Sequence, residues 1–423
     1  SAVYSTNLYL FSVPIIPDFL HTTNIKLLPK SDNEEIEREN GPVGVLLSSK
    51  ALVQLFLNPV VGIWTTKIGY KVPIFFGSVN LLLASLLFAY GESYMSMLLA
   101  RSIQGVSSAC IGVSGMCLAA STFRTDSGQR SRAMGILLGG GALGVTTGYP
   151  IGGFLYEFVG KTAPFFIIAI LVSLTLVLQI MFLDFKSETN TVWWPLLSDG
   201  VIIVVTGAIF ISTSAMAILE PCLPIWLMTH LKPEKWQVGT VFIPDSLGYL
   251  LGTNLFGAVA IKVGQWKVSV IALLTIGIAA LIIPTATSLG QLLLPHFGLG
   301  LGIGALDAAL VPLLATLVES RHGACYGAVF SLQQTAVSLA YSVAPLVGGA
   351  LARGIGFAWT LRGLGLLNAL YSPLLAALAW KLNSSIQYSP NNIRPPQVSS
   401  ESLTFQSVSA SRNRDLRLFN SSQ

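Results

Sequence analysis

Apolar stretches of about twenty residues follow one another along most of the chain, separated by short polar or charged connections. A helix needs roughly 20 mostly apolar residues to cross a bilayer, so each stretch predicts a spanning helix. The twelve stretches cover residues 1–20, 43–65, 72–92, 95–120, 133–156, 162–183, 199–227, 238–261, 267–286, 290–317, 325–350 and 357–380. The pattern predicts an all-α membrane protein with twelve transmembrane helices. Its first helix is predicted to be truncated, because the chain enters it directly at Ser1.

A short pattern of glycine and lysine occurs twice, after the second and the eighth apolar stretch. Gly62, Lys67 and Gly69 return 195 residues later as Gly257, Lys262 and Gly264. The pair of glycines at 152–153, near the end of the fifth stretch, likewise returns 196 residues later at the end of the eleventh. Two pseudo-symmetric six-helix halves, related by an axis along the membrane normal with a substrate site between them, explain this spacing.

The predicted organisation therefore has four parts. Six-helix bundles cover residues 1–183 and 199–380, a cytosolic linker covers 184–198, and a tail covers 381–423. The tail is rich in Ser, Asn and Arg, a composition typical of disordered segments. We expect a disordered cytosolic tail that is a candidate binding segment for trafficking proteins.

The composition excludes an ordinary soluble enzyme. The chain is 52% hydrophobic and 10% charged, whereas soluble globular chains are about 25% charged. No nucleophile with a nearby base, no cluster of metal ligands and no phosphate-binding motif is found, so neither catalysis nor a cofactor or metal is expected. The basic residues are scattered over the connections, so the expected surrounding is a lipid bilayer and not nucleic acid. The four cysteines, Cys110, Cys117, Cys222 and Cys325, are predicted to pack as small apolar residues.

Basic residues also indicate which helix ends face the cytosol. If the connections after the even-numbered stretches are cytosolic, they and the tail hold fourteen Lys and Arg residues, against seven on the other side. Cytosolic connections of membrane proteins are enriched in Lys and Arg. Both termini are therefore predicted to be cytosolic, and the acidic segment before the second stretch is predicted to be an outer loop.

Four charged residues lie inside apolar stretches: Lys50, Arg101, Glu220 and Asp307. A charge at the centre of a membrane helix costs roughly 2.5 to 3.5 kcal/mol on insertion scales. Such residues usually pair with each other or line a polar pathway. The chain is therefore predicted to move a solute across a membrane.

Several motifs resemble those of the major facilitator superfamily. The repeated glycine-lysine pattern is similar to its loop motif, with Thr66 in place of the usual Asp, and residues 101–105 (Arg-Ser-Ile-Gln-Gly) resemble its helix-four motif. Its proton-antiporter motif in helix five is matched by a glycine-rich run whose spaced members are Gly144, Gly148 and Gly152. Glycines at this spacing let two helices approach closely.

Longer segments resemble one branch, the vesicular amine transporters, over residues 1 to about 380. The segments are 13–17, 49–55, 155–165, 219–226, 306–307 and 321–327. The resemblance implies a proton-coupled antiporter that carries a monoamine-like organic cation from the cytosol into secretory or synaptic vesicles by alternating access.

Residue roles follow from the chemistry and from this resemblance. The expected proton-coupling residues are Asp307, Glu220 and His322, the last in a predicted loop. The expected substrate contacts are Glu220, Tyr249, Tyr341, Phe330, Gln334, Thr213, Ser5 and Asn7, and Trp226 is a further candidate for an aromatic wall around a cation. Lys50, Arg101 and Asp245 are expected to form a charge and gating network, although the resemblance assigns Asp245 no role.

Two departures from the family pattern concern charge. The family has an Asp in helix one as counter-ion of the substrate amine, where this chain has Ser5. It has another Asp in helix eleven, paired with the helix-two lysine, where this chain has Gln334. Lys50 is therefore expected to pair with Asp307 or Asp245, or to be neutral.

These departures leave two alternatives to amine antiport. One is a facilitator of a less cationic organic solute, working as an uncoupled uniporter. The other is a transport-inactive scaffold that acts through its polar tail.

Overall fold

The computed structural model describes residues 34–387 except 92, 161, 183–193, 232–236, 238, 239 and 324. The predicted first helix, with Ser5 and Asn7, lies outside these residues. The first part of the chain forms α2 (Glu34–Ile68), α3 (Lys71–Tyr90), α4 (Tyr94–Thr122), α5 (Ser127–Phe158), α6 (Ala163–Phe182) and the short α7 (Trp194–Leu197). The second part forms α8 (Gly200–His230), α10 (Ile243–Val263), α11 (Gln265–Ile282) with the 3-10 turn η1 (Ile283–Thr285), α12 (Leu289–His322), α13 (Tyr326–Gly354) and α14 (Phe357–Gln387).

The described residues contain no strand, which confirms the predicted all-α class. Ten of their helices are long and apolar enough to cross a bilayer. These are α2, α3, α4, α6, α8 and α10 to α14; α5, which the sequence also predicts to span, is not one of the ten. Of the described residues, those up to Ala376 belong to one compact unit and those from Ala377 to another.

Several helices extend beyond their predicted ends. α2 begins at Glu34, inside the segment predicted as an acidic outer loop, because the apolar pattern marks the membrane boundary and Glu and Arg are good helix formers. α5 begins at Ser127 because Asp126 Oδ1 accepts the backbone N–H groups of Gly128 and Gln129 at 2.9 Å each. Helix also appears as α7 in the predicted linker, and α14 continues to Gln387 in the predicted tail.

The repeated glycine pattern has the same backbone role in both copies. Gly69 has φ 80° between α2 and α3, and Gly264 has φ 112° between α10 and α11. Side chains are rarely tolerated at such positive φ, which explains why glycine occupies both positions. Each copy therefore ends one helix and begins the next with almost no loop.

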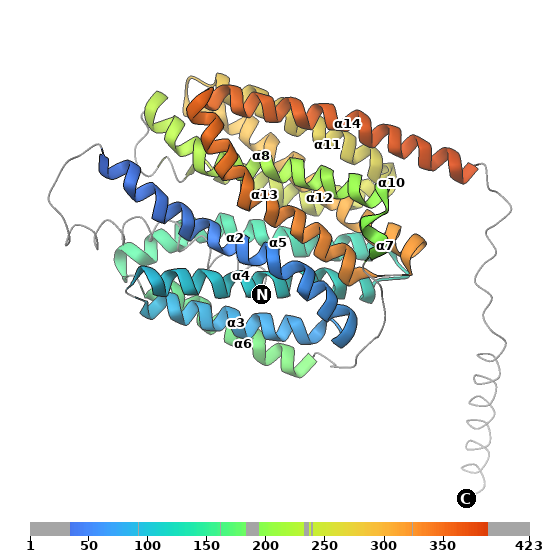
Figure 1. Ribbon diagram of the computed structural model, residues 1–423, viewed down its shortest axis with the longest axis horizontal. Coiled ribbons are helices and arrows are strands. Elements are labelled where there is room, and N and C mark those ends of the chain that lie inside the picture. The colour runs from blue at the N-terminus through green and yellow to red at the C-terminus, as the bar shows by residue number, and fades with distance from the viewer. Residues whose placement is uncertain are drawn as a thin grey trace, which may run out of the picture. The chain divides into compact units, whose positions relative to one another are not determined.

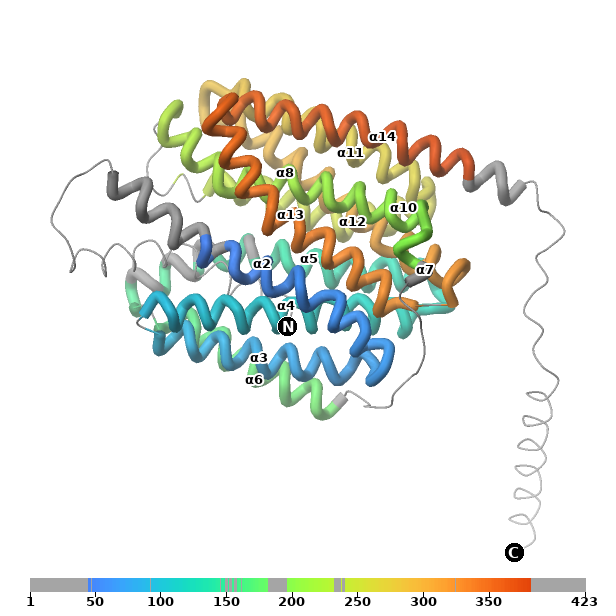
Figure 2. The backbone as a smooth tube through the Cα atoms, viewed as in Figure 1, coloured from blue at the N-terminus to red at the C-terminus, as the bar shows by residue number. Residues whose placement is uncertain are grey.

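The two parts of the chain meet along pairs of helices. α2 packs against α13 and α5 against α10, so the blue and orange segments run side by side (Figures 1 and 2). Within the first part, α3 packs on α4 and α6, and α2 on α4. Within the second part, α12 packs on α10 and α11, and α8 on α13.

Glycines bring α10 and α12 into backbone contact. A Cβ added to Gly252 would lie 2.7 Å from the carbonyl oxygen of Leu301, and one added to Gly304 would lie 2.5 Å from that of Tyr249. Gly248 and Gly300 approach the facing backbone just as closely. This contact fixes the side chains of α10 against those of α12.

Candidate functional site

Asp307 lies in the middle of α12 and is buried, with 8% of its surface exposed. The hydroxyl of Tyr249 on α10 donates a hydrogen bond of 2.8 Å to its Oδ2. The other oxygen, Oδ1, is buried and has no hydrogen-bond partner in the described part of the chain. Tyr249 also interacts electrostatically with Tyr341 of α13 and with Asp245. The structure thus brings Asp307, Tyr249 and Tyr341 together.

Glu220 connects the two parts of the chain by charge. It lies on α8 just before Pro221, and its carboxylate interacts electrostatically with Lys50 of α2. Lys50 in turn interacts with Arg101 of α4. Glu220 is thus an acid that acts on Lys50, a partner that the sequence did not predict.

Arg101 is fully buried, so its side chain does not extend outward to the membrane surface. Its Nη1 donates to Gln104 Oε1 at 3.4 Å, one turn along α4. Asp245 lies in the first turn of α10, is 5% exposed, and interacts with Glu220. We call Lys50, Arg101, Glu220, Asp245 and Asp307 the buried charge network; Arg101, Asp245 and Asp307 are buried, and Lys50 and Glu220 are half-buried.

His322 lies elsewhere. It is in the last turn of α12, not in the predicted loop, because α12 continues to a left-handed Gly323 (φ 66°). From Asp307 it is about four turns away, roughly 22 Å along the helix axis. The three predicted proton-coupling residues therefore do not gather at one place.

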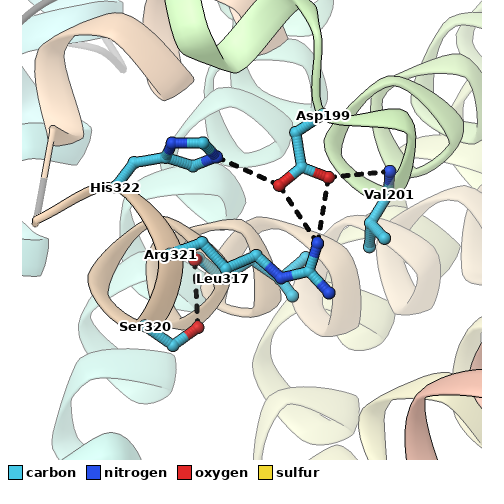
Figure 3. Close-up of polar contacts among 6 residues, drawn as sticks. All are labelled: Asp199, Val201, Leu317, Ser320, Arg321 and His322. Carbon is cyan, nitrogen blue, oxygen red and sulfur yellow. Dashed lines mark hydrogen bonds and ion pairs between the residues drawn. The ribbon is translucent and has the colours of Figure 1, made fainter. Parts of the chain in front are cut away.

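His322 instead belongs to a polar cluster with Asp199 and Arg321, shown in Figure 3. Its Nε2 lies 3.0 Å from Asp199 Oδ2, and Arg321 Nη1 donates to both Asp199 oxygens at 3.1 Å. Asp199 also accepts the Val201 N–H at 3.0 Å, which caps α8. Burial raises the pKa of Asp199, but the hydrogen bonds from His322, Arg321 and Val201 and the charge of Arg321 outweigh it, so the pKa is lowered.

The remaining predicted contacts are dispersed. Phe330 is fully buried and stacks on Tyr326, with ring centroids 6.4 Å apart, and Trp226 stacks on Phe357. Gln334 faces Gly112 on α4, so the side chain that replaces the family's helix-eleven Asp packs between α13 and α4. Thr213 is buried two turns before Glu220, on the same face of α8.

The glycine motifs have packing roles. A Cβ on Gly62 would meet the side chain of Ser331 and lie 2.9 Å from the carbonyl oxygen of Gly327. Lys67 is exposed. Gly144 and Gly148 are buried on α5, which also contains Gly152.

Lys67, Arg130 and Arg321 lie at helix ends that we call the basic end. A set of polar contacts that was not predicted from the sequence joins the two parts of the chain there. Arg130 Nη1 of α5 pairs with Glu319 Oε1 of α12 at 2.7 Å, and its Nη2 donates to Thr316 at 2.8 Å. Tyr326 donates a hydrogen bond to the same Glu319 oxygen. We call the contacts of Arg130 with Glu319 and Thr316, together with that of Tyr326, the basic-end seal. In the sequence, Arg and Glu at helix ends resemble ordinary solvated charges, so only their mutual position in the structure reveals the contact.

A second polar contact between the two parts lies farther along the helices, where Asn58 of α2 donates to Ser338 of α13 at 3.0 Å.

The described residues contain no group of three or more His, Cys, Asp or Glu side chains able to hold a metal. The four cysteines are free and buried, as predicted for packing residues. The buried polar groups are thus carboxylates, cations and hydroxyls between helices. Such an arrangement can bind a charged solute or exchange protons.

Comparison with known proteins agrees with this architecture. The family model "Major Facilitator Superfamily" matches residues 2–193 and 205–414. The human organic anion transporter MFSD10 (TETRAN) has a similar fold, with a TM-score of 0.74 at 16% identity, over 88% of this chain and 96% of that chain.

Closer relatives are found by sequence. The human synaptic vesicular amine transporter is 41% identical over 360 residues, covering 83% of this chain and 70% of that protein. The human chromaffin granule amine transporter is 42% identical over 344 residues, covering 80% and 65%. The probable vesicular acetylcholine transporter-B of Danio rerio is 35% identical over 395 residues, covering 91% and 79%. The chain therefore belongs to the vesicular amine transporter family of the major facilitator superfamily.

Proposed function

We propose that this protein is a proton-coupled antiporter that moves an organic cation or amine, monoamine-like in character, from the cytosol into secretory or synaptic vesicles. The observation that carries the proposal is the buried carboxylate of Asp307, held by the Tyr249 hydroxyl in the middle of α12. The named functions of its relatives support it, since they are vesicular amine transporters. A buried acid that can take up and release a proton is what such an exchange requires.

In this proposal the basic end faces the cytosol, and both termini are cytosolic. A proton from the vesicle lumen is accepted by Asp307 and leaves to the cytosol, while the cation enters in the opposite direction and is held by Glu220. Alternating access requires the basic-end seal to open, because Arg130 and Glu319 join the two parts of the chain there. The helix pairs α2/α13 and α5/α10 are the contacts that must slide.

The test is uptake of a panel of radiolabelled amines into acid-inside proteoliposomes, with and without a proton uncoupler. Wild-type protein is expected to accumulate at least one amine, and both the uncoupler and Asp307→Asn are expected to abolish accumulation. Asp126→Asn is the matched control, since Asp126 is an exposed helix cap and Asn also caps helices well. Accumulation that is indifferent to Asp307→Asn would refute the role given to Asp307.

A second candidate function is uniport of a less cationic organic solute. The observation that favours it is Gln334, a neutral side chain packed against α4 where the family has an acid. Uptake that is indifferent to the uncoupler supports this candidate. A protein that neither binds nor accumulates any of the panel supports the transport-inactive scaffold instead.

A further inference from the structure

The buried charge network has one more acid than it has cations. Lys50 and Arg101 are its bases, and Glu220, Asp245 and Asp307 are its acids. The cations lie in the first part of the chain, where Lys50 acts on Glu220, whereas the only charge that acts on Asp245 among the described residues is the like charge of Glu220. When all five groups are ionised, the network has room for one further positive charge, close to Asp245.

The position of Asp245 favours its ionised form but leaves that charge without a described cation beside it. It lies in the first turn of α10, where the dipole of this long helix stabilises negative charge. An acid in this position normally accepts a backbone N–H or faces water. Here the residue is 95% buried, and Oδ1 has no hydrogen-bond partner in the described part of the chain.

The packing of α12 holds this carboxylate in place. A Cβ on Gly300 would lie 2.8 Å from Asp245 Oδ1 and would collide with the Asp245 backbone carbonyl. One turn before Gly300, His296 bonds Val241 O through Nδ1 at 2.7 Å, and its Nε2 has no described partner. Tyr249 lies one turn after Asp245 on α10, and the negative charge of Asp245 acts on its phenol group.

The part of α8 around Glu220, which interacts electrostatically with Asp245, is rich in hydrogen-bond acceptors. Pro221 and Pro224 lie inside the helix and have no N–H group. The backbone carbonyls four residues earlier, those of Ala217 and Glu220, therefore lack their helical donors. Two carboxylates, two freed carbonyls and an aromatic ring match a ligand that brings several donors and one positive charge, which describes an alkylammonium group.

We propose that Asp245, together with Glu220, is the counter-ion of the substrate's ammonium group in this chain. Asp245 thereby takes over the charge that the family has in helix one and that Ser5 does not supply. The inference rests on the proposed function, because it needs an amine substrate. It adds the residue that fixes where the ammonium group lies.

The experiment measures equilibrium binding of radiolabelled tryptamine to purified full-length protein. Tryptophol, which carries a hydroxyl in place of the ammonium group, is the neutral competitor. Asp245→Asn should raise the Kd for tryptamine at least about tenfold, as expected when one partner of a buried charge pair is removed. The same variant should change the inhibition constant of tryptophol less than about twofold, and Asp126→Asn should change neither.

Each outcome decides one point. Unchanged tryptamine binding by a folded Asp245→Asn protein overturns the inference alone. Lost uptake with unchanged binding also overturns it, because Asp245 then serves the proton and not the amine. If Asp245→Asn does not give a monodisperse protein, Asp245→Ser removes the same charge with a smaller side chain and the same expected result. Wild-type protein that neither binds nor accumulates any of the amine panel overturns the proposed function as well.

Discussion

At the scale of single residues, the protein places acids where membrane helices rarely have them and supports each one differently. Asp307 accepts a hydrogen bond from a tyrosine hydroxyl, and Glu220 interacts with a lysine across the two parts of the chain. Asp199, just before α8, caps that helix and pairs with Arg321 at the basic end. The support of Asp307 can be tested separately from its charge, because the donor is on another helix.

Tyr249→Phe should slow uptake without abolishing it. The variant removes a hydrogen bond to a charged group, worth about 1.5 to 3 kcal/mol, and keeps the ring. Initial uptake rates in acid-inside proteoliposomes should therefore fall about tenfold or more, yet stay above those of Asp307→Asn. Tyr90→Phe is the control, since that exposed hydroxyl lies at the far end of α3. A rate equal to wild type would show that the hydrogen bond does not matter for uptake.

Asp199→Asn should lower thermal stability in a way that depends on pH. The pKa of Asp199 is lowered in the folded protein from its usual 3.8, so the ionised carboxylate stabilises the fold above that pH. This contribution is lost as the pH falls through the folded-state value. Asn keeps the cap on α8, so the difference reports the pairs with Arg321 and His322.

The measurement is the unfolding midpoint of both proteins in detergent. The two should differ at about pH 7, and the difference should shrink progressively as the pH falls below about 4. A difference in midpoint that stays constant over this range would show that the lower stability of the variant does not come from the lost charge of Asp199.

The sequence identified most of these residues but not their partners. An acid inside an apolar stretch is visible in any hydropathy profile, which is why Glu220 and Asp307 were predicted. The partner of Lys50 depends on the rotation of α2 against α8, and sequence spacing does not fix that angle. His322 was placed in a loop because polar residues at a helix end give the same pattern as a loop.

At the scale of helices, glycine determines which pairs come into contact. α10 and α12 meet backbone to backbone through Gly248, Gly252, Gly300 and Gly304. The hydropathy pattern predicted where these helices are but not that they form a pair. The repeated Gly69 and Gly264 turns, in contrast, were predictable because the motif requires a positive φ.

Gly252→Ala should destabilise the protein. Its Cβ would lie 2.7 Å from Leu301 O and 2.8 Å from Ala305 N, so the two helices must separate, and overpacking of this kind costs typically about 1 to 3 kcal/mol. The unfolding midpoint in detergent should drop by several degrees. Gly349→Ala is the control, because nothing lies within 4 Å of a Cβ there and Ala favours helix. Equal midpoints for the two variants would contradict the close contact.

At the scale of the whole molecule, polar side chains join the two parts at more than one level. Arg130, Glu319, Thr316 and Tyr326 form one group at the basic end, and Asn58 and Ser338 form a contact farther along α2 and α13. The offset of the repeated glycines predicts two repeated halves. The side of the membrane to which the protein opens is not predictable from the sequence, since it depends on charge pairs between residues far apart in the chain.

Arg130→Gln should favour opening at the basic end. Cys325 reports this opening, because it is buried beside Tyr326 in the sealed form. In a protein whose other three cysteines are replaced by alanine, the rate of maleimide labelling of Cys325 should rise several-fold in the variant. Combining Arg130→Glu with Glu319→Arg should restore slow labelling, since it re-forms the pair with reversed charges. Equal labelling rates in all three proteins would show that the pair does not hold this end closed.

The close approach of α10 and α12 also bears on selectivity. Two helices in backbone contact have no side-chain layer to rearrange, so they are expected to move as one rigid body during transport. The distances between Asp245, Tyr249 and Asp307 are then the same in every conformation of the transport cycle. The size of solute that fits is then expected to depend on helices that can shift, namely α2 and α13, which pack against each other across the two parts of the chain. Variation among substrates is therefore expected to follow changes in those two helices, while the position of the positive charge stays the same.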